Sequence, residues 1–131
     1  MSSEVHFVVC KDREISEIPR TLIEEAFAGL LKEKGEDVWL LIYPDGSLGE
    51  LHFGSQVGET TFSIDRPPAC EAFWKATFDL LQRTPSVLLW PSGESVVAHP
   101  EARDQIPASI TEAMGEPTFI RSHLEILQMF Q

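Results

Sequence analysis

Four histidines and two cysteines are the side chains of this sequence best suited to proton transfer, nucleophilic attack or metal binding. They are His6, His52, His99, His123, Cys10 and Cys70. None of the histidines belongs to a recognised ligand spacing with another histidine, a cysteine or a carboxylate, so no metal site is expected. His52 follows Glu50 by two residues on the polar side of a predicted strand, and it is the best candidate for proton transfer. The simpler interpretation of His52 is an exposed residue of a sheet.

The two cysteines lie within apolar stretches, and neither belongs to a Cys-x-x-Cys motif. A nucleophilic thiol needs an electropositive and partly open setting, which apolar neighbours do not provide. Both cysteines are therefore predicted to be buried thiols of a reducing compartment. The serines lack a Gly-x-Ser-x-Gly motif, and the glycines within residues 46–58 lack the lysine of a phosphate-binding loop. The sequence consequently predicts a non-enzymatic protein with no catalytic residue and no cofactor.

The charge of the chain limits the partners that it can bind. Its 131 residues include 21 acidic and 10 basic side chains, which gives a formal net charge of -11. Nucleic acids and anionic membranes need a cationic surface, so neither is expected as a partner. An acidic protein instead associates rapidly with a basic protein. No stretch approaches the length of a membrane span, and the first residues lack a basic signal-peptide region, so the expected location is cytoplasmic.

Acidic residues gather in two parts of the sequence, and both are candidate partner-binding surfaces. The first cluster follows three predicted strands and their turns, with His52 beside it: Asp45, Glu50, Glu59 and Asp65. The second cluster surrounds the first predicted helix: Glu24, Glu25, Glu33, Glu36 and Asp37. Acidic groups of this kind speed the encounter with a basic partner, while a few buried aromatic residues supply affinity.

Apolar spacing and capping residues predict three or four helices. The first extends from Pro19 to Lys34, with Gly35 just beyond its end, and the second from Ala69 to Arg83. A third is expected over residues 103–114, although Pro107 in its interior suggests that it begins at residue 107. Residues 122 and 125 have the Ser-x-x-Glu spacing of a capping box, which opens a final helix.

Short apolar or alternating stretches predict about six or seven strands. They are residues 5–10, 38–43, 48–53, 59–65, 87–90, 95–98 and 117–120. Hairpin connections dominate, so residues 1–131 are expected to form a single α+β domain with a mostly antiparallel sheet. The continuously apolar strands need cover on both faces. Either helices cover both faces, which is the favoured expectation, or one face stays partly bare as a docking surface.

A short pattern is repeated in the two halves of the chain. Residues 41–46 read LIYPDG and residues 88–93 read LLWPSG, and Glu-Ala-Phe precedes each, at residues 25–27 and 71–73. Each unit is a helix followed by an apolar strand, a Pro-x-Gly turn and a second strand. The similarity indicates an αββ pseudo-repeat, which arises either by duplication or because the same handover from helix to hairpin reuses the same residue types.

The small size, the acidity and the lack of a catalytic motif resemble the immunity proteins of bacterial toxin systems. The resemblance covers the whole chain and implies a protein that binds and neutralises a basic toxin or effector domain. The order α-β-β-β-α-β-β-α between residues 19 and 114 is also similar to that of the class I chaperones of type III secretion, which are small acidic dimers. The strand at residues 5–9 and the segment after residue 117 depart from that order. A small enzyme with an unrecognised site is the third alternative, and the oligomeric state is left open.

Overall fold

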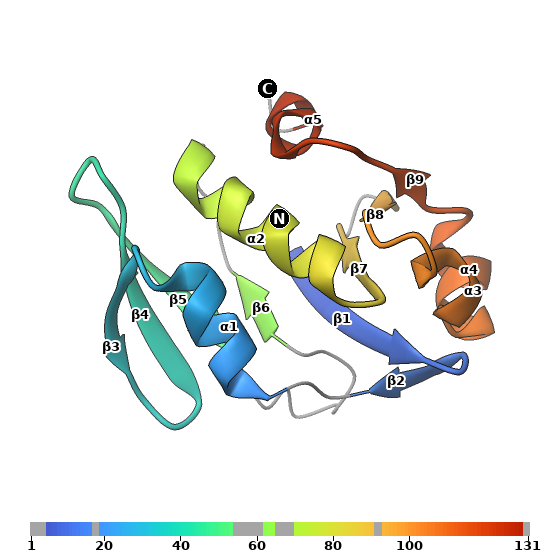
Figure 1. Ribbon diagram of the computed structural model, residues 1–131, viewed down its shortest axis with the longest axis horizontal. Coiled ribbons are helices and arrows are strands. Elements are labelled where there is room, and N and C mark those ends of the chain that lie inside the picture. The colour runs from blue at the N-terminus through green and yellow to red at the C-terminus, as the bar shows by residue number, and fades with distance from the viewer. Residues whose placement is uncertain (1–4, 17–18, 54–61, 65–69, 91–92, 130–131) are drawn as a thin grey trace.

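The computed structural model describes residues 5–16, 19–53, 62–64, 70–90 and 93–129. Nine strands in these segments form one sheet, and the same segments contain five helices (Figure 1). The strands are β1 (Val5–Lys11), β2 (Glu14–Ser16), β3 (Leu31–Lys34), β4 (Val38–Ile42), β5 (Leu48–His52), β6 (Phe62–Ile64), β7 (Ser86–Leu89), β8 (Ser95–Val97) and β9 (Thr118–Phe119). The helices are α1 (Arg20–Phe27), α2 (Glu71–Arg83), α3 (Ala102–Gln105), α4 (Ala108–Met114) and α5 (His123–Met129).

The sheet has the order β3-β4-β5-β6-β1-β7-β8-β9. Every pairing between described strands is antiparallel except that of β8 with β9. β6 pairs with the first half of β1 and β2 with its second half, so β1 has neighbours along both edges. The predicted α+β class with a mostly antiparallel sheet is confirmed. The two strands beyond the seven predicted are β2 and β3.

One face of the sheet, the front face, carries the main hydrophobic core. Helices α1 and α2 lie over this face, and α5 packs beside α2 (Figure 1). The core joins alternate residues of the strands to the inner sides of these helices, including Phe7, Leu41, Leu51, Phe73 and Leu80. Each such side chain contributes roughly 1.5–3 kcal/mol by leaving water, so the fully buried aromatic and aliphatic residues dominate the stability of the fold.

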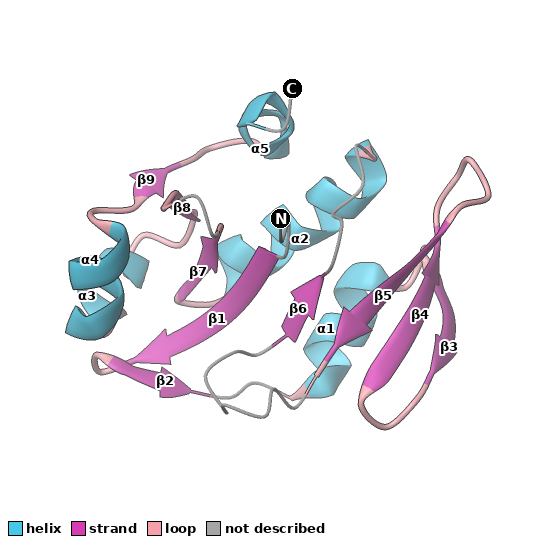
Figure 2. Ribbon diagram, turned by 180° about the vertical axis from the view of Figure 1, so that it is seen from behind, coloured by secondary structure: helices cyan, strands magenta, loops and turns pink. Residues whose placement is uncertain are grey.

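The other face of the sheet, the back face, is covered over only part of its area. Helices α3 and α4 pack behind β1, β7 and β8, where a second and smaller core includes Val8, Cys10, Val97 and Ile106. Viewed from behind, these helices stand at one end of the sheet, while α1 and α2 lie beyond the strands (Figure 2). No described helix covers the backs of β4 and β5. The expectation that helices cover both faces is therefore wrong for this half of the sheet.

The first predicted helix is shorter than its apolar pattern suggests. Helix α1 ends at Phe27, the chain turns over residues 28–30, and residues 31–34 return as strand β3. The backbone of Leu30 donates to Phe27 at 2.8 Å and accepts from Ile42 at 2.8 Å, which closes the helix and begins the strand pairing. Residues 31–34 pair with β4 and do not extend α1, because without β3 one edge of β4 would lack backbone hydrogen bonds. The new edge strand is charged, with Lys32, Glu33 and Lys34 in sequence, as suits an exposed edge.

Two other segments differ from the prediction. The charged stretch after β1, expected as a connector, forms a hairpin to β2 through Asp12 and Arg13, which both have positive φ. The segment expected as one helix over residues 103–114 instead forms α3 and α4, because proline cannot donate within a helix. Helix α4 begins directly after Pro107, which agrees with the alternative start at residue 107. Of the strand predicted for residues 59–65, the structure describes residues 62–64 as β6.

The described residues of the two repeated turns make the same hydrogen bonds. In the first, Tyr43 donates to Ser47 at 2.9 Å and Gly46 donates to Tyr43 at 2.8 Å. In the second, Trp90 donates to Glu94 at 2.9 Å and Gly93 to Trp90 at 3.1 Å. The two glycines have φ of +89° and +99°, which explains why glycine ends both patterns. The duplication itself stays a hypothesis, since shared turn chemistry accounts for this likeness.

The capping box that was predicted for the final helix is present. Leu124 donates its backbone N–H to the Ser122 hydroxyl at 3.1 Å, and Ser122 donates its own to the Glu125 carboxylate at 3.1 Å. The two bonds satisfy donors at the start of α5, which would otherwise lack partners in the helix.

Replacing Phe73 by alanine tests the main core. Phe73 is 1% exposed, and its ring centroid lies 5.6 Å from that of Phe27. Phe73→Ala should therefore lower the free energy of unfolding by about 3–5 kcal/mol. Phe119→Ala is the matched control, because Phe119 is 48% exposed and its loss should cost less than about 1 kcal/mol. Urea unfolding followed by fluorescence measures both. Equal losses for the two variants would contradict the described core.

Candidate functional site

The first predicted acidic cluster is only partly brought together by the fold. Asp45 lies at the exposed tip of the β4–β5 turn and accepts from the Ser47 hydroxyl at 2.6 Å and the Ser47 backbone at 2.9 Å. These bonds lower the pKa of Asp45 below its usual value. Glu50 lies further along β5, where its carboxylate is 3.9 Å from the His52 ring. Glu59 and Asp65, which were also predicted, lie outside the described residues.

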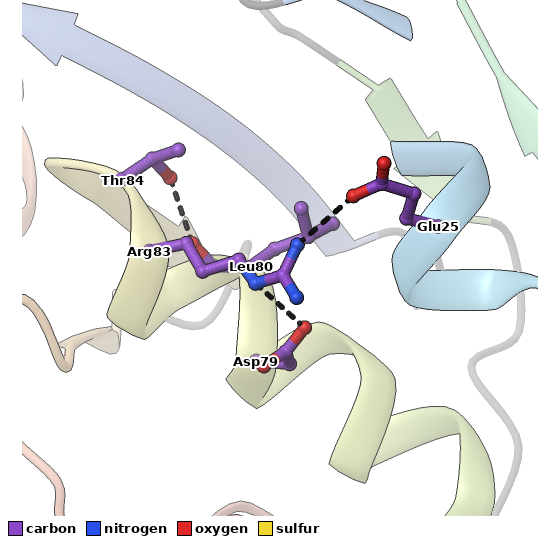
Figure 3. A network of polar contacts seen from close by, with 5 residues as sticks. All are labelled: Glu25, Asp79, Leu80, Arg83 and Thr84. Atoms are coloured by element: carbon purple, nitrogen blue, oxygen red, sulfur yellow. Dashed lines mark hydrogen bonds and ion pairs between the residues drawn. The ribbon is translucent and has the colours of Figure 1, made fainter. Parts of the chain in front are cut away.

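Two of the five residues in the second predicted cluster, Glu24 and Glu25, are paired with basic side chains. Glu24 pairs with Lys34 of β3 at 2.6 Å. Glu25 pairs with Arg83 of α2 at 3.3 Å, and Arg83 also contacts Asp79 at 3.2 Å (Figure 3). All of these pairs are well exposed, so each is worth only about 0–1 kcal/mol, but they remove Glu24 and Glu25 from the charge available to a partner.

The remaining acidic residues of the second cluster lie around the β3–β4 hairpin. Glu36 and Asp37 are exposed in its turn, where the Glu36 carbonyl accepts a hydrogen bond from Arg20. Glu33 lies within β3. Within the described residues, no ion pair involves Glu33, Glu36 or Asp37. These three carboxylates therefore remain available to a basic partner.

Members of the two clusters meet on the back face of the sheet. Leu40 of β4 is paired with Glu33 on one side and with Glu50 on the other. Residues directly opposite each other in a sheet project from the same face, so the two carboxylates stand on either side of Leu40. The sequence prediction placed Glu33 and Glu50 in separate clusters, because it took Glu33 to be part of a helix.

The same area carries an exposed apolar surface, which agrees with the less favoured of the two expectations, a partly bare sheet face. Ile42 and Leu48 are paired across β4 and β5, and they are 40% and 55% exposed. Val38 and Leu40, on the same side of β4, are half-buried. We call the back-face residues of these two strands the bare half-face: Val38, Leu40, Ile42, Leu48, Glu50 and His52. Exposed apolar side chains grouped on one surface with polar groups at their border are typical of protein-binding sites.

The prediction that β4 is buried on both faces is therefore wrong. Only Trp39, Leu41 and Tyr43 are buried, and they all lie on the front face. A continuous run of apolar residues looks the same whether its second face is covered by the protein itself or by another molecule. A signal available in the sequence was the alternation in β5, where Leu51 is apolar and its neighbours Glu50 and His52 are polar.

Two titratable residues of the cores have raised pKa values. Burial raises the pKa of Cys10 to about 11, so its thiol is protonated and unreactive at neutral pH. Burial, with a smaller effect of Cys70, also raises the pKa of Tyr43 to about 12. His123 contacts Glu71 at 2.9 Å and thereby links α5 to α2. In the described segments, no group of three or more His, Cys, Asp or Glu side chains is arranged to hold a metal ion.

A second surface feature lies on the opposite side of the protein. An open groove of about 630 Å³ runs between α1, α2 and α5, with Ala26, Leu30, Ala72 and Ala76 among its apolar lining and Lys75 among its polar lining. The groove mixes both charges, since Asp79 also lines it. It is a weaker candidate than the bare half-face for a basic partner, because the opposite charges of Lys75 and Asp79 offset each other there.

Comparisons with known proteins give no match to a family model, a curated protein or a solved structure. Among the described helices, none is long and apolar enough to cross a membrane.

Two leucines of β5 provide a direct test of the bare half-face. Leu51 is completely buried on the front face and Leu48 is 55% exposed on the back face. We expect Leu51→Ala to lower the free energy of unfolding by about 2–5 kcal/mol, and Leu48→Ala to change it by less than about 1 kcal/mol. Chemical denaturation measures both values. A loss at Leu48 as large as that at Leu51 would show that the back face is covered.

Proposed function

We propose that this chain is a non-enzymatic protein-binding module that binds and neutralises a basic partner protein, in the manner of an immunity protein acting on a toxin. The observation that carries the proposal is the bare half-face, where half-buried Leu40 stands between Glu33 and Glu50 and the exposed pair Ile42 and Leu48 lies further along the same strands. An apolar centre with a charged border is the arrangement found in protein interfaces.

The charge of the whole chain supports the same type of partner. A net charge of -11 attracts a basic protein over distances of about 10 Å at moderate salt and speeds the formation of the complex. The exposed carboxylates close to the bare half-face then orient the partner. The apolar residues supply affinity, because a surface charge alone contributes little.

A secretion-type chaperone is the alternative binding function. The structure adds β3 to the order of elements on which that comparison rests, so the segment from α1 to α3 has one strand more. A chaperone of this kind would be a stable dimer, whereas a neutralising protein is expected to bind its target one-to-one. Light scattering of the purified chain distinguishes the two, and a stable dimer would favour the chaperone.

The gene product encoded next to this chain is the first partner to test. We expect that product to be basic, to kill cells when it is expressed alone, and to be neutralised when the two are expressed together. Calorimetry should show a one-to-one complex. A neighbour that is harmless, or one whose toxicity persists with this chain present, would contradict the proposed function.

The charge contribution is tested with two matched double variants. Glu33→Gln with Glu50→Gln should lower the association rate constant by roughly three- to tenfold at low salt and reduce its salt dependence. Glu101→Gln with Glu112→Gln removes the same charge from exposed positions near α3 and α4, and it should have a smaller effect. Stopped-flow mixing at several salt concentrations measures both. Equal effects of the two double variants would show that net charge alone governs association.

A further inference from the structure

The bare half-face lacks the helical layer that covers the back of β1, β7 and β8. Helices α1 and α2 cover the front face, and α3 and α4 cover the back of β1, β7 and β8 (Figures 1 and 2). Every described covering element is thus a helix. Sheets with apolar faces are stabilised when an amphipathic element completes the layer, so the vacant position has the shape and polarity that suit a further helix.

From this vacancy and the proposed function, on which the inference rests, we propose that the partner docks a basic amphipathic helix along β4. Its apolar stripe lies over Val38, Leu40, Ile42 and Leu48, and its lysine or arginine residues lie opposite Glu33 and Glu50.

The dimensions of a helix and of this surface agree along the strand. Alternate residues of β4, such as Leu40 and Ile42, are about 6.7 Å apart along the strand. One helical turn brings residues i and i+4 to the same side with a rise of about 6 Å. A helix that runs along β4 can therefore place successive apolar side chains over Val38, Leu40 and Ile42.

The dimensions also agree across the strands. Glu33 and Glu50 belong to β3 and β5, which lie on either side of β4, so their backbones are about 10 Å apart. A helix with its side chains is about 10–12 Å wide. Lysine and arginine residues at the two borders of an apolar stripe can extend outward and place their charges at these carboxylates.

Charge argues against a second copy of this chain as the occupant. A symmetric dimer through the bare half-face would bring Glu33 and Glu50 close to the same residues of the other copy. Each copy also has a net charge of -11. Like charges in an interface repel, so the surface fits a basic partner better than it fits itself.

Strand addition is a less suitable way to bind at this end of the sheet. The free edge is β3, which has four residues and carries Lys32, Glu33 and Lys34. A short, charged edge strand hinders pairing with another strand. The bare half-face beside β3 exposes Ile42 and Leu48, and such an apolar surface suits the apolar side of a helix.

The probe is a synthetic helical peptide of leucine and lysine, in which lysines border a leucine stripe on both sides. A peptide of identical composition in scrambled order, which has no continuous stripe, is the control. Both are titrated into the full chain, labelled for NMR. We expect the amphipathic peptide to shift signals of β3, β4 and β5 and to bind at least tenfold more tightly than the scrambled peptide.

Two matched double variants locate the contact. Ile42→Thr with Leu48→Thr should weaken binding of the amphipathic peptide at least tenfold, and threonine suits both strand positions. Phe119→Thr with Leu124→Thr alters exposed apolar residues elsewhere, at 48% and 49% exposure, and should change binding less than twofold. Circular dichroism confirms that each variant is folded.

Several outcomes would overturn the inference. In the first, the two peptides bind equally tightly, and in the second, the signals that shift are confined to the groove between α1, α2 and α5. In the third, the Ile42/Leu48 variant binds the amphipathic peptide as tightly as the unchanged chain does. In the fourth, the unchanged chain forms a dimer without peptide while the Ile42/Leu48 variant is a monomer, which would make a second copy the occupant. The neighbouring gene product separates the inference from the proposed function. If the Ile42/Leu48 variant still neutralises it fully, only the docking surface is wrong. If the unchanged chain fails to neutralise it while the peptide docks as expected, the proposed function is wrong.

Discussion

The structure depends on burying strand β1 from both sides. Phe7 faces the front, where its ring stacks on that of Phe62 with 4.8 Å between centroids, and Val8 and Cys10 face the back, under α3 and α4. Because both edges of β1 are also paired, its backbone hydrogen bonds are satisfied within the sheet. The two cores therefore meet at this strand, because alternate side chains of β1 belong to the front core and to the back core.

The described helices cover the back face only near β1, and the bare half-face lies outside this covered area. Helices α3 and α4 are short and follow β8 in the chain, so they cover the back of the strands nearest to them. Beyond β6, the backs of β4 and β5 have no described helix, and Ile42 and Leu48 remain exposed. Stability there is supplied by the front face alone, which leaves the side chains of the back face available for binding.

Local patterns predicted much of this fold, and long-range pairing decided the rest. Helix α2, strands β1, β4, β5, β7 and β8, and the capping box at Ser122 follow from periodicity and turn chemistry that neighbouring residues fully determine. Strand β3 could not be predicted, because Leu30 and Leu31 continue the helical pattern of α1 and only β4 makes the strand favourable. Likewise, the pairing of Glu24 with Lys34 and the position of Glu33 beside Leu40 exist only once β3 has formed. Thus the negative charge of the surface could be predicted from the sequence, but the positions of the carboxylates relative to one another could not.

In the free protein the backs of β4 and β5 face solvent, and this is the surface at which we propose that a partner binds. Relaxation enhancement of methyl signals by a soluble gadolinium chelate measures this exposure directly in the free protein. We expect strong enhancement at the methyl groups of Ile42 and Leu48, and little at those of Leu41 and Leu51, which belong to the same strands but are completely buried. Equal protection of all four side chains would contradict this expectation, since the back of these strands would then already be covered.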